Sequence, residues 1–241
     1  MNLFQNKKVL ITGGSNGIGL AITREFLNQG AIVNNIDIVA SDLNNKNLKT
    51  IIFDLKNTKD ISKLVKSIEV DILINNVGIL QKLDLLSTTV EDFQNVFDIN
   101  FMSAFVLTQE ISKKFINKKT NGKIVNISSI NSKVGIPSQF SYGISKAALN
   151  QLTKLSAITL AKHNILVNAV CPGSIKTDIH KDIYKEADSY VIQRTPLRRW
   201  GNPEEVAKLV LFLSSDDNTY ITGECIDIDG GRMCLNFFSK G

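Results

Sequence analysis

The sequence predicts an α/β fold in which a doubly wound parallel sheet carries helices on both faces. Short apolar runs rich in β-branched residues recur along the chain, and segments with a helical spacing of apolar residues separate most of them. Strands that alternate with helices form right-handed βαβ units, so we expect the strands to be parallel and buried. A chain of 241 residues with 43% apolar residues can bury a full core. We therefore expect one domain over residues 1–241.

The apolar runs and the periodic segments define the expected elements. Each run is short, as is typical of a strand covered on both faces. The predicted strands are 8–12, 31–37, 49–54, 71–75, 122–128, 165–171 and 224–229. The predicted helices are 18–29, 58–68, 89–117, 142–162 and 203–214.

Composition excludes several classes of protein. Only three consecutive apolar residues, Val9 to Ile11, precede the first glycines, which is too short for a signal-peptide core, and no stretch approaches the length of a membrane span. Cys171, Cys225 and Cys234 are odd in number and lack metal-site spacing, so we expect no metal and a reducing compartment. The sequence therefore favours a cytoplasmic protein without a membrane partner.

The net charge of +5 raises the question of an acidic partner. Most basic residues are dispersed, so we expect no nucleic acid partner. The densest group runs from Lys113 to Lys123 at the end of a predicted helix. It is either a solvated helix end, where cations suit the helix dipole, or a docking patch for an acidic carrier or a phosphorylated substrate.

A glycine-rich segment follows the first predicted strand. Gly13, Gly17 and Gly19 have the spacing Gly-x-x-x-Gly-x-Gly between that strand and the next helix. Backbone N–H groups and a helix N-terminus can hold a pyrophosphate there, although glycines also serve plain tight turns. We expect this segment to bind a dinucleotide through Gly13, Ser15, Asn16, Gly17, Ile18 and Gly19.

Asp37 bears on the choice of dinucleotide. It ends the second predicted strand, where a carboxylate can accept hydrogen bonds from ribose hydroxyls and would repel a 2′-phosphate. Ile38 follows, and no arginine or lysine is placed to receive that phosphate. Asp37 therefore favours NAD(H), with NADP(H) as the alternative, unless it is only a turn or capping residue. Asp54 and Leu55, after the third strand, are expected on the adenine side of the cofactor, or Asp54 is a turn residue.

Tyr142 and Lys146 form a second constellation. A phenol is too weak an acid to exchange protons at neutral pH unless a positive neighbour lowers its pKa. Residues four apart share one face of a helix, so the Lys146 ammonium can lie near the Tyr142 phenol. The pair can therefore act as an acid or base.

Other motifs occur in a fixed order. They are Asn75-Asn76-Val77-Gly78, Asn100, Ser129, Tyr142-x-x-x-Lys146 and Pro172-Gly173-x-x-x-Thr177. Together with the glycine segment they make the chain resemble the short-chain dehydrogenase/reductase family over nearly all of its length. Two small departures are Val77, where the family usually has alanine, and the extension past Gly231 with Leu235-Asn236-Phe237-Phe238. The resemblance implies a Rossmann-like fold and an NAD(P)-dependent oxidoreductase acting on CH–OH groups.

The resemblance also implies a role for each motif residue. Tyr142 would be the general acid or base, and Lys146 would hold the nicotinamide ribose and lower the pKa of the phenol. Ser129 would orient the substrate oxygen, and Asn100 would hold a water that passes protons to Lys146. Taken singly, Ser129 could cap a turn, Asn100 could satisfy helix backbone and Tyr142 could be an ordinary aromatic residue. Further cofactor contacts are implied for Asn76, Gly78, Pro172, Gly173, Ile175 and Thr177.

The substrate is left open between alternatives. Residues 178–200 mix aromatic, apolar and charged side chains and are expected to form a movable lid. Its length resembles that of bacterial 3-oxoacyl-carrier-protein reductases, which usually take NADPH, whereas Asp37 favours NAD(H). The first hypothesis is therefore an NAD(H)-dependent enzyme for a small-molecule secondary alcohol/ketone pair. The alternatives are a 3-oxoacyl reductase that meets an acyl carrier protein and a catalytically silent dinucleotide-sensing module.

The resemblance further implies a homodimer or homotetramer formed through helices 89–117 and 142–162 and the last strand.

Overall fold

The computed structural model describes residues 2–177 and 184–235. Its strands are β1 (Lys8–Thr12), β2 (Ile32–Asp37), β3 (Leu48–Ile52), β4 (Ile72–Asn75), β5 (Lys123–Ile127), β6 (Leu166–Pro172) and β7 (Cys225–Ile228). They form one seven-stranded sheet in the order β3-β2-β1-β4-β5-β6-β7, and every neighbouring pair is parallel. Each strand lies within two residues of its predicted bounds. The predicted α/β fold is confirmed.

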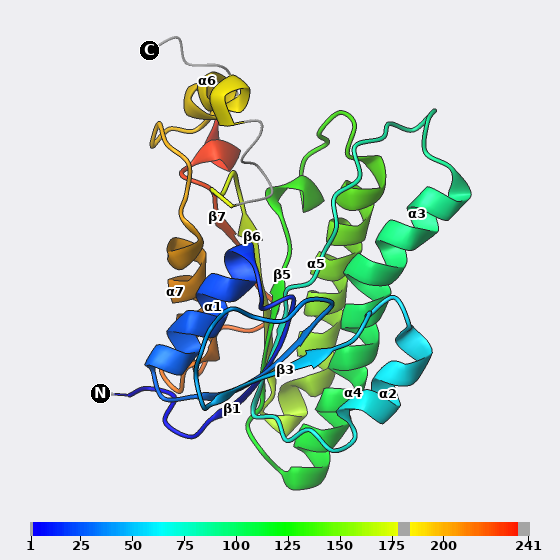
Figure 1. Ribbon diagram of the computed structural model, residues 1–241. Helices are drawn as coiled ribbons and strands as arrows, with labels where there is room; N and C mark the ends of the chain where they lie inside the picture. Colours follow the sequence, from blue (N-terminus) through cyan, green and yellow to red (C-terminus); the bar gives the residue numbers. More distant parts are fainter. Residues whose placement is uncertain (1, 178–183, 236–241) are drawn as a thin grey trace.

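Helices cover both faces of the sheet (Figure 1). They are α1 (Gly17–Asn28), α2 (Thr58–Val65), α3 (Val90–Phe97), α4 (Ser103–Lys118), α5 (Phe140–Leu160), α6 (Tyr184–Arg194) and α7 (Pro203–Ser214), with short turns η1 (Asp98–Met102), η2 (Ile130–Ser132), η3 (Ala161–His163) and η5 (Arg232–Cys234). Helices α1 and α7 lie side by side on one face, and α2, α4 and α5 lie on the other.

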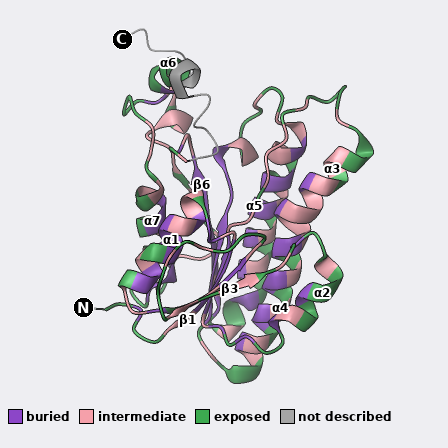
Figure 2. Ribbon diagram, in the orientation of Figure 1, coloured by how far each residue is buried: buried purple, intermediate pink, exposed green. Residues whose placement is uncertain are grey.

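Alternating residues of the central strands feed two separate cores. Val9 and Ile11 of β1 pack with α1 and α7, whereas Leu10 between them packs with the α4 residues Leu107 and Ile111. The period of two in a strand sends neighbouring side chains to opposite faces, which explains the division. The central strands are accordingly buried along their length (Figure 2).

The order of the strands places one position of special interest at the centre of the sheet. β1 pairs with β2 on one side and with β4 on the other, so the chain winds in opposite directions from this point. In open parallel sheets, ligands bind outside the carboxyl ends of the strands at such a switch point. The segments that follow β1 and β4 are the glycine-rich segment and the Asn76–Val77–Gly78 turn.

Two predicted elements need correction, and one helix was not predicted. The helix expected over 89–117 is divided into α3 and α4 by the π-helical turn η1, which adds one residue to a turn. The third strand ends at Ile52, so Asp54 lies in the following loop. Within the expected lid, residues 178–183 lie outside the described part of the chain, and Tyr184–Arg194 forms α6, which apolar periodicity did not indicate.

Candidate active site

The glycine-rich segment has a backbone that requires its glycines. Gly13 and Gly17 have φ values of 66° and 53°, in the left-handed region that side chains disfavour. A Cβ atom on Gly19 would lie 2.0 Å from the carbonyl oxygen of Gly13, so the first turn of α1 packs directly on the preceding backbone. These three glycines, singled out from their spacing, therefore shape one tight turn at the N-terminus of α1, where N–H groups are open to an anion.

Side chains from β2 fix this turn. Asn35 Oδ1 accepts a 2.7 Å hydrogen bond from the Gly14 N–H, and Asn35 Nδ2 donates to Ser15 Oγ at 2.9 Å. Asn35 is fully buried, and a Cβ on Gly14 would lie 2.7 Å from its Oδ1 atom. Sequence reasoning missed Asn35, although a buried amide inside an apolar strand is itself a signal of a polar partner.

Asp37 is held by backbone amides at the end of β2. Its Oδ2 atom accepts from the Ser15 N–H at 2.9 Å, and its Oδ1 atom accepts from the Val39 N–H at 3.2 Å. Ser15 Oγ donates to the Val39 carbonyl at 2.9 Å, which closes the arrangement. Ile38 is largely exposed, and residues 38–41 contain no basic side chain. The carboxylate is thus placed beside the turn with free lone pairs and no neighbouring cation in this segment.

The segment after β4 lies against the glycine-rich turn. Asn76 Nδ2 donates to the carbonyl oxygens of Thr12 and Gly13 at 3.0 and 2.9 Å. Thr12 Oγ1 accepts from the N–H groups of Asn76 and Val77, each at 3.0 Å. Asn76 therefore joins the two segments at the switch point.

Gly78, Asn100 and Lys146 lie together. A Cβ on Gly78 would be 3.1 Å from Lys146 Nζ and 3.5 Å from Asn100 Oδ1. Asn100 sits in η1 and exchanges hydrogen bonds with the backbone of Ile79, with its Oδ1 accepting at 2.8 Å and its Nδ2 donating at 3.0 Å. The π-helical turn thus directs a buried amide toward Lys146, where a regular helix would change its direction.

Tyr142 and Lys146 occupy the first two turns of α5, as the four-residue spacing predicts. Lys146 Nζ lies 5.8 Å from the centre of the Tyr142 ring and donates to the Ile127 carbonyl at 2.8 Å. Burial lowers the pKa of Lys146 to about 8. Burial also raises the pKa of the Tyr142 phenol, which a hydrogen bond with Ser129 lowers only in part. Ser129 follows β5 and also accepts from the Asn131 N–H at 3.1 Å, so it caps η2 as well.

The segment after β6 borders the same edge. Gly173 packs on β7, since a Cβ there would lie 2.8 Å from Asp229 Cα. The Thr177 methyl lies near Gly17, where it would be 3.5 Å from an added Cβ. Ile175 is buried and lines a cavity of about 100 Å³ with Ser174.

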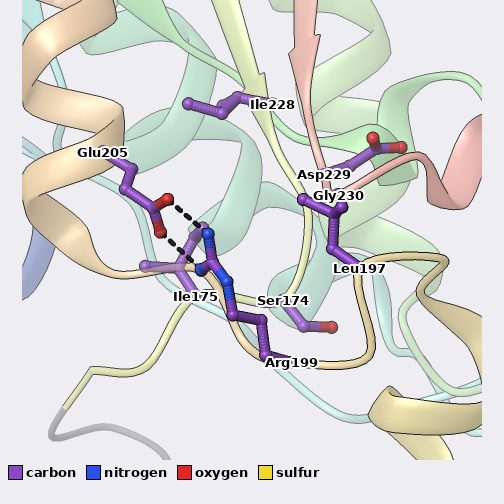
Figure 3. A pocket seen from close by; sticks show the side chains of 9 residues that line it. Ser174, Ile175, Leu197, Arg199, Glu205, Ile228, Asp229 and Gly230 are labelled. Carbon is purple, nitrogen blue, oxygen red and sulfur yellow. Dashed lines mark hydrogen bonds and ion pairs between the residues drawn. The ribbon is translucent and has the colours of Figure 1, made fainter.

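That cavity is closed by charged and apolar side chains (Figure 3). The Arg199 guanidinium makes hydrogen bonds of 2.8 and 2.7 Å with the two carboxylate oxygens of Glu205. The rest of the lining consists of Leu197, Gly201, Ile228, Asp229 and Gly230. The cavity thus brings the segment of Ile175 together with residues 197–205 and with the end of β7.

Leu55 and Asp54, both predicted to contact the cofactor, lie between β3 and α2. Leu55 is 3% exposed and its side chain belongs to the core beneath α2, so only its backbone can meet a ligand. The Asp54 carboxylate accepts from the Lys56 N–H at 2.9 Å, in the turn that precedes α2. Asn16 and Ile18 flank the first residue of α1, whereas Pro172, expected just after the sixth strand, is the last residue of β6.

Sequence reasoning also missed Ser145. This buried hydroxyl accepts from Asn100 Nδ2 at 3.1 Å and donates to the Tyr142 carbonyl at 2.7 Å. It therefore links η1 to the first turn of α5. Its position directly before Lys146 was the available signal, but serine alone does not reveal a tertiary partner.

The described residues contain neither a cluster of metal-ligating side chains nor a membrane-spanning helix. Over 2–177 and 184–235, no group of three or more His, Cys, Asp or Glu side chains could hold a metal ion. In the same part of the chain, no helix is long and apolar enough to cross a membrane.

Comparison with known proteins agrees with this geometry. A family model described as Enoyl-(Acyl carrier protein) reductase matches residues 13–232. The 3-oxoacyl-[acyl-carrier-protein] reductase FabG of Thermotoga maritima is 37% identical over 248 residues, covering 95% of this chain and 98% of that protein. The L-rhamnose 1-dehydrogenase (NADP(+)) of Thermoplasma acidophilum is 38% identical over 247 residues, covering 95% and 97%.

A solved structure extends the comparison to three dimensions. The 4-hydroxyisoleucine dehydrogenase complexed with NADH superposes with a TM-score of 0.92 at 32% identity, covering 96% of this chain and 100% of that one. The family match spans the glycine-rich turn, the Ser129–Tyr142–Lys146 set and the β6 segment together. The chain therefore belongs to the short-chain dehydrogenase/reductase family and is an NAD(P)-dependent oxidoreductase acting on CH–OH groups.

Proposed function

We propose that this enzyme is an NAD(H)-dependent dehydrogenase or reductase that acts on a secondary alcohol/ketone pair, with Tyr142 as its acid and base. The observation that carries the proposal is the meeting of Ser129, Tyr142 and Lys146 at the carboxyl edge of the sheet, next to the glycine-rich turn. A proton donor, an orienting hydroxyl and a cation are what carbonyl reduction needs beside a dinucleotide.

Tyr142 would hold and release the proton. Because burial raises the pKa of its phenol, Tyr142 is protonated at neutral pH and can donate to a carbonyl oxygen during reduction. Ser129 hydrogen-bonds the phenol and would offer the same substrate oxygen a second hydrogen bond, which orients it. In the oxidation direction the phenolate form would accept the alcohol proton.

Lys146 would stabilise that phenolate. With a pKa of about 8, its ammonium is charged in about nine of ten molecules at pH 7. The expected lowering of the Tyr142 pKa by Lys146 is not found in this structure: burial raises that pKa, and only the hydrogen bond with Ser129 opposes it, so the phenol ionises only when positive charge comes nearer. Asn100 lies close to Lys146 across Gly78 and would hold a water that returns protons to it.

The residues present fit a dinucleotide. Backbone N–H groups at the start of α1 are left for a pyrophosphate. The left-handed glycines, the close contact of Gly13 with Gly19 and the hydrogen bonds from Asn76 after β4 shape the backbone around them. Asp37 would accept hydrogen bonds from the adenosine ribose, and Lys146 would donate to the nicotinamide ribose. Ile175 and Thr177 would border the carboxamide. When bound, the nicotinamide supplies or accepts the hydride.

Asp37 supports NAD(H) over NADP(H). Its carboxylate is fixed beside the turn by two backbone amides, so it cannot easily swing away from a 2′-phosphate. No basic side chain in residues 38–41 offsets that charge. The NADH complex among the solved relatives agrees with this preference, whereas the rhamnose dehydrogenase is named for NADP(+).

A 3-oxoacyl thioester carried by an acyl carrier protein is the second candidate substrate. The name of the Thermotoga relative favours it. The basic group from Lys113 to Lys123 gives it less support than expected. Lys113 pairs with Glu110 at 2.6 Å and Lys118 pairs with Glu69 at 3.0 Å. Lys114 donates to carbonyl groups at the end of α2 and just after it. These cations are largely used within the molecule.

A silent sensing module fits the site less well. Dinucleotide recognition needs the glycine turn and Asp37, but it does not need a phenol hydrogen-bonded to Ser129 above a buried cation. The complete set of reacting side chains therefore favours an enzyme.

We also propose self-association through α4 and α5. Leu155 and Ile158 are 55% and 76% exposed on α5, and Phe105 is partly exposed on α4. Exposed apolar side chains on these two helices support an interface there. Residues 236–238 of the C-terminal extension lie outside the described part of the chain. Free thiols at Cys171, Cys225 and Cys234 suit a reducing compartment such as the cytoplasm.

Initial rates test the proposal. NADH and NADPH oxidation would be measured side by side with acetoacetyl thioester and with small secondary ketones as acceptors. We expect NADH to be preferred with at least one ketone. Turnover with the thioester would promote the second candidate substrate, and a preference for NADPH would show that Asp37 does not set the cofactor.

A further inference from the structure

Two carboxamide side chains meet beside the reacting residues. Asn131 Nδ2 donates a hydrogen bond to Gln139 Oε1. The Asn131 N–H donates to Ser129 Oγ at 3.1 Å, and the Gln139 carbonyl accepts from the N–H of Gly143, next to Tyr142, at 2.9 Å. Each of the two segments that carry a reacting side chain thus also carries one carboxamide.

The start of α5 directs Gln139 into this pair. Gln139 occupies the N-cap position, yet its side chain makes no capping hydrogen bond with the helix. The residue before it, Ser138, has φ of 60°, a left-handed conformation that is unusual for a residue other than glycine. A backbone strained in this way next to a reacting residue commonly serves a site rather than the helix. The side chain is held away from its own helix and toward Asn131.

The pair leaves a defined set of open hydrogen-bonding groups. Within the described residues, neither carboxamide makes another side-chain hydrogen bond. When one carboxamide donates to another, one carbonyl oxygen and one NH2 group remain free, whichever way the two amides are oriented. Both residues are half-buried, and their backbones bond to Ser129 and to Gly143 beside Tyr142, so the pair adjoins the reacting side chains.

A hydroxyl group complements that set. Carboxylate and thioester oxygens only accept, so they would satisfy the NH2 group and leave the amide oxygen facing another oxygen. A hydroxyl can accept from the NH2 group and donate to the oxygen at once. Resting on the function proposed above, we propose that Asn131 and Gln139 form a substrate-binding subsite for a hydroxyl group close to the reacting carbon. The substrate class is then a polyhydroxylated alcohol or a hydroxyketone rather than a plain alkyl or acyl chain.

Matched substrates test this subsite. Oxidation of 2,3-butanediol would be compared with that of 2-butanol, and of 2,4-pentanediol with 2-pentanol. We expect wild-type kcat/KM to be higher by about tenfold or more for the diol of at least one pair, the value of one good hydrogen bond. Gln139→Met and Asn131→Leu should each abolish that preference while leaving the mono-alcohol within about twofold.

Two further variants separate binding from folding. Gln139→Glu retains the shape of the side chain but removes the NH2 group, so it should lose the diol preference even if Gln139→Met is unstable. Gln94→Met, on the exposed side of α3, is the matched control and should keep the preference. Equal wild-type kcat/KM for diol and mono-alcohol, or variants that slow both alike, would overturn the subsite alone. If the wild type oxidises no alcohol and reduces none of the corresponding ketones with either cofactor, the proposed function falls and the subsite falls with it.

Discussion

Lys146 Nζ lies 5.8 Å from the centre of the Tyr142 ring and is anchored by a 2.8 Å hydrogen bond to the Ile127 carbonyl oxygen. Ile127 ends β5, the strand that leads to Ser129. The ammonium is therefore held between the strand that leads to Ser129 and the helix that carries the phenol. Its burial lowers the pKa of Lys146 to about 8, so its charge changes near the working pH of an enzyme.

Replacing this lysine should reveal the cost of burying its charge. The pKa of Lys146 falls from 10.5 to about 8 on folding. Between these values the unfolded chain binds a proton that the folded chain has released, so the wild type gains stability as the pH rises through this window. The Lys146→Met variant lacks this gain in stability. The difference between its free energy of unfolding and that of the wild type should therefore become less favourable to the variant by about 2 to 3 kcal/mol when the pH is raised from 7.5 to 10.

Urea unfolding at both pH values measures this change. Lys59→Met on α2 is the control, because its ammonium is exposed in the folded state and should leave the difference from wild type constant. A constant difference for Lys146→Met as well would show that Lys146 is charged in the folded protein throughout this range.

Substitution by alanine should lower the stability of the protein at one glycine and leave it almost unchanged at another. A Cβ on Gly19 would lie 2.0 Å from the Gly13 carbonyl oxygen, whereas a Cβ on Gly135 would meet no atom within 4 Å. Gly19→Ala should destabilise the protein by about 3 kcal/mol and weaken NADH binding, because the turn must open to admit the methyl group. Gly135→Ala should change stability by less than about 0.5 kcal/mol. Thermal unfolding and NADH titration compare them, and a Gly19→Ala variant that binds NADH normally would refute the close packing.

Asp37 should control discrimination against the 2′-phosphate. Asp37→Asn removes the negative charge and keeps one oxygen that can accept from either the Ser15 or the Val39 amide. We expect KM for the NADP form to fall by about tenfold, since removing one repulsive charge is worth about 1.4 kcal/mol. KM for the NAD form should rise only modestly. Asp217→Asn, in the turn after α7, is the matched control. Unchanged cofactor preference in Asp37→Asn would place the determinant elsewhere.

The prediction from sequence succeeded where local chemistry decides the structure. The strands were predicted to within two residues because buried β-branched runs have few alternatives. Gly13, Gly17 and Gly19 were predicted in one turn, since their backbone angles and contacts admit only glycine. The four-residue spacing likewise placed Lys146 and Tyr142 together on α5.

The prediction failed where distant residues decide it. The π-helical turn that holds Asn100 is stabilised by the backbone of Ile79, twenty-one residues away, and periodicity cannot show such a contact. Asn35 and Ser145 were missed because a single polar residue does not name its partner. Helix α6 was missed because its composition is largely polar. The roles of Ser129 and Asn100 came only from family resemblance and stay predictions.

A charge on the exposed face of α5 should disrupt self-association. Ile158 is 76% exposed, so Ile158→Glu should not disturb the fold of a subunit. Placed in an apolar interface, the unpaired carboxylate should shift a dimer or tetramer toward smaller species. Light scattering on wild type, Ile158→Glu and the control Leu86→Glu, which alters an exposed residue of the loop before α3, measures the effect. A monomeric wild type would refute the interface.

The most direct test of the account is the turnover of Tyr142→Phe. This change removes only the phenolic hydroxyl, so the ring, the α5 helix and the Lys146 anchor should remain. Initial rates of NADH oxidation with an accepted ketone would be measured together with NADH binding by fluorescence titration. The account predicts a loss of kcat of about a thousandfold or more with NADH affinity within about threefold of wild type. Substantial turnover by Tyr142→Phe, with the cofactor bound normally, would contradict the assignment of Tyr142 as the acid and base.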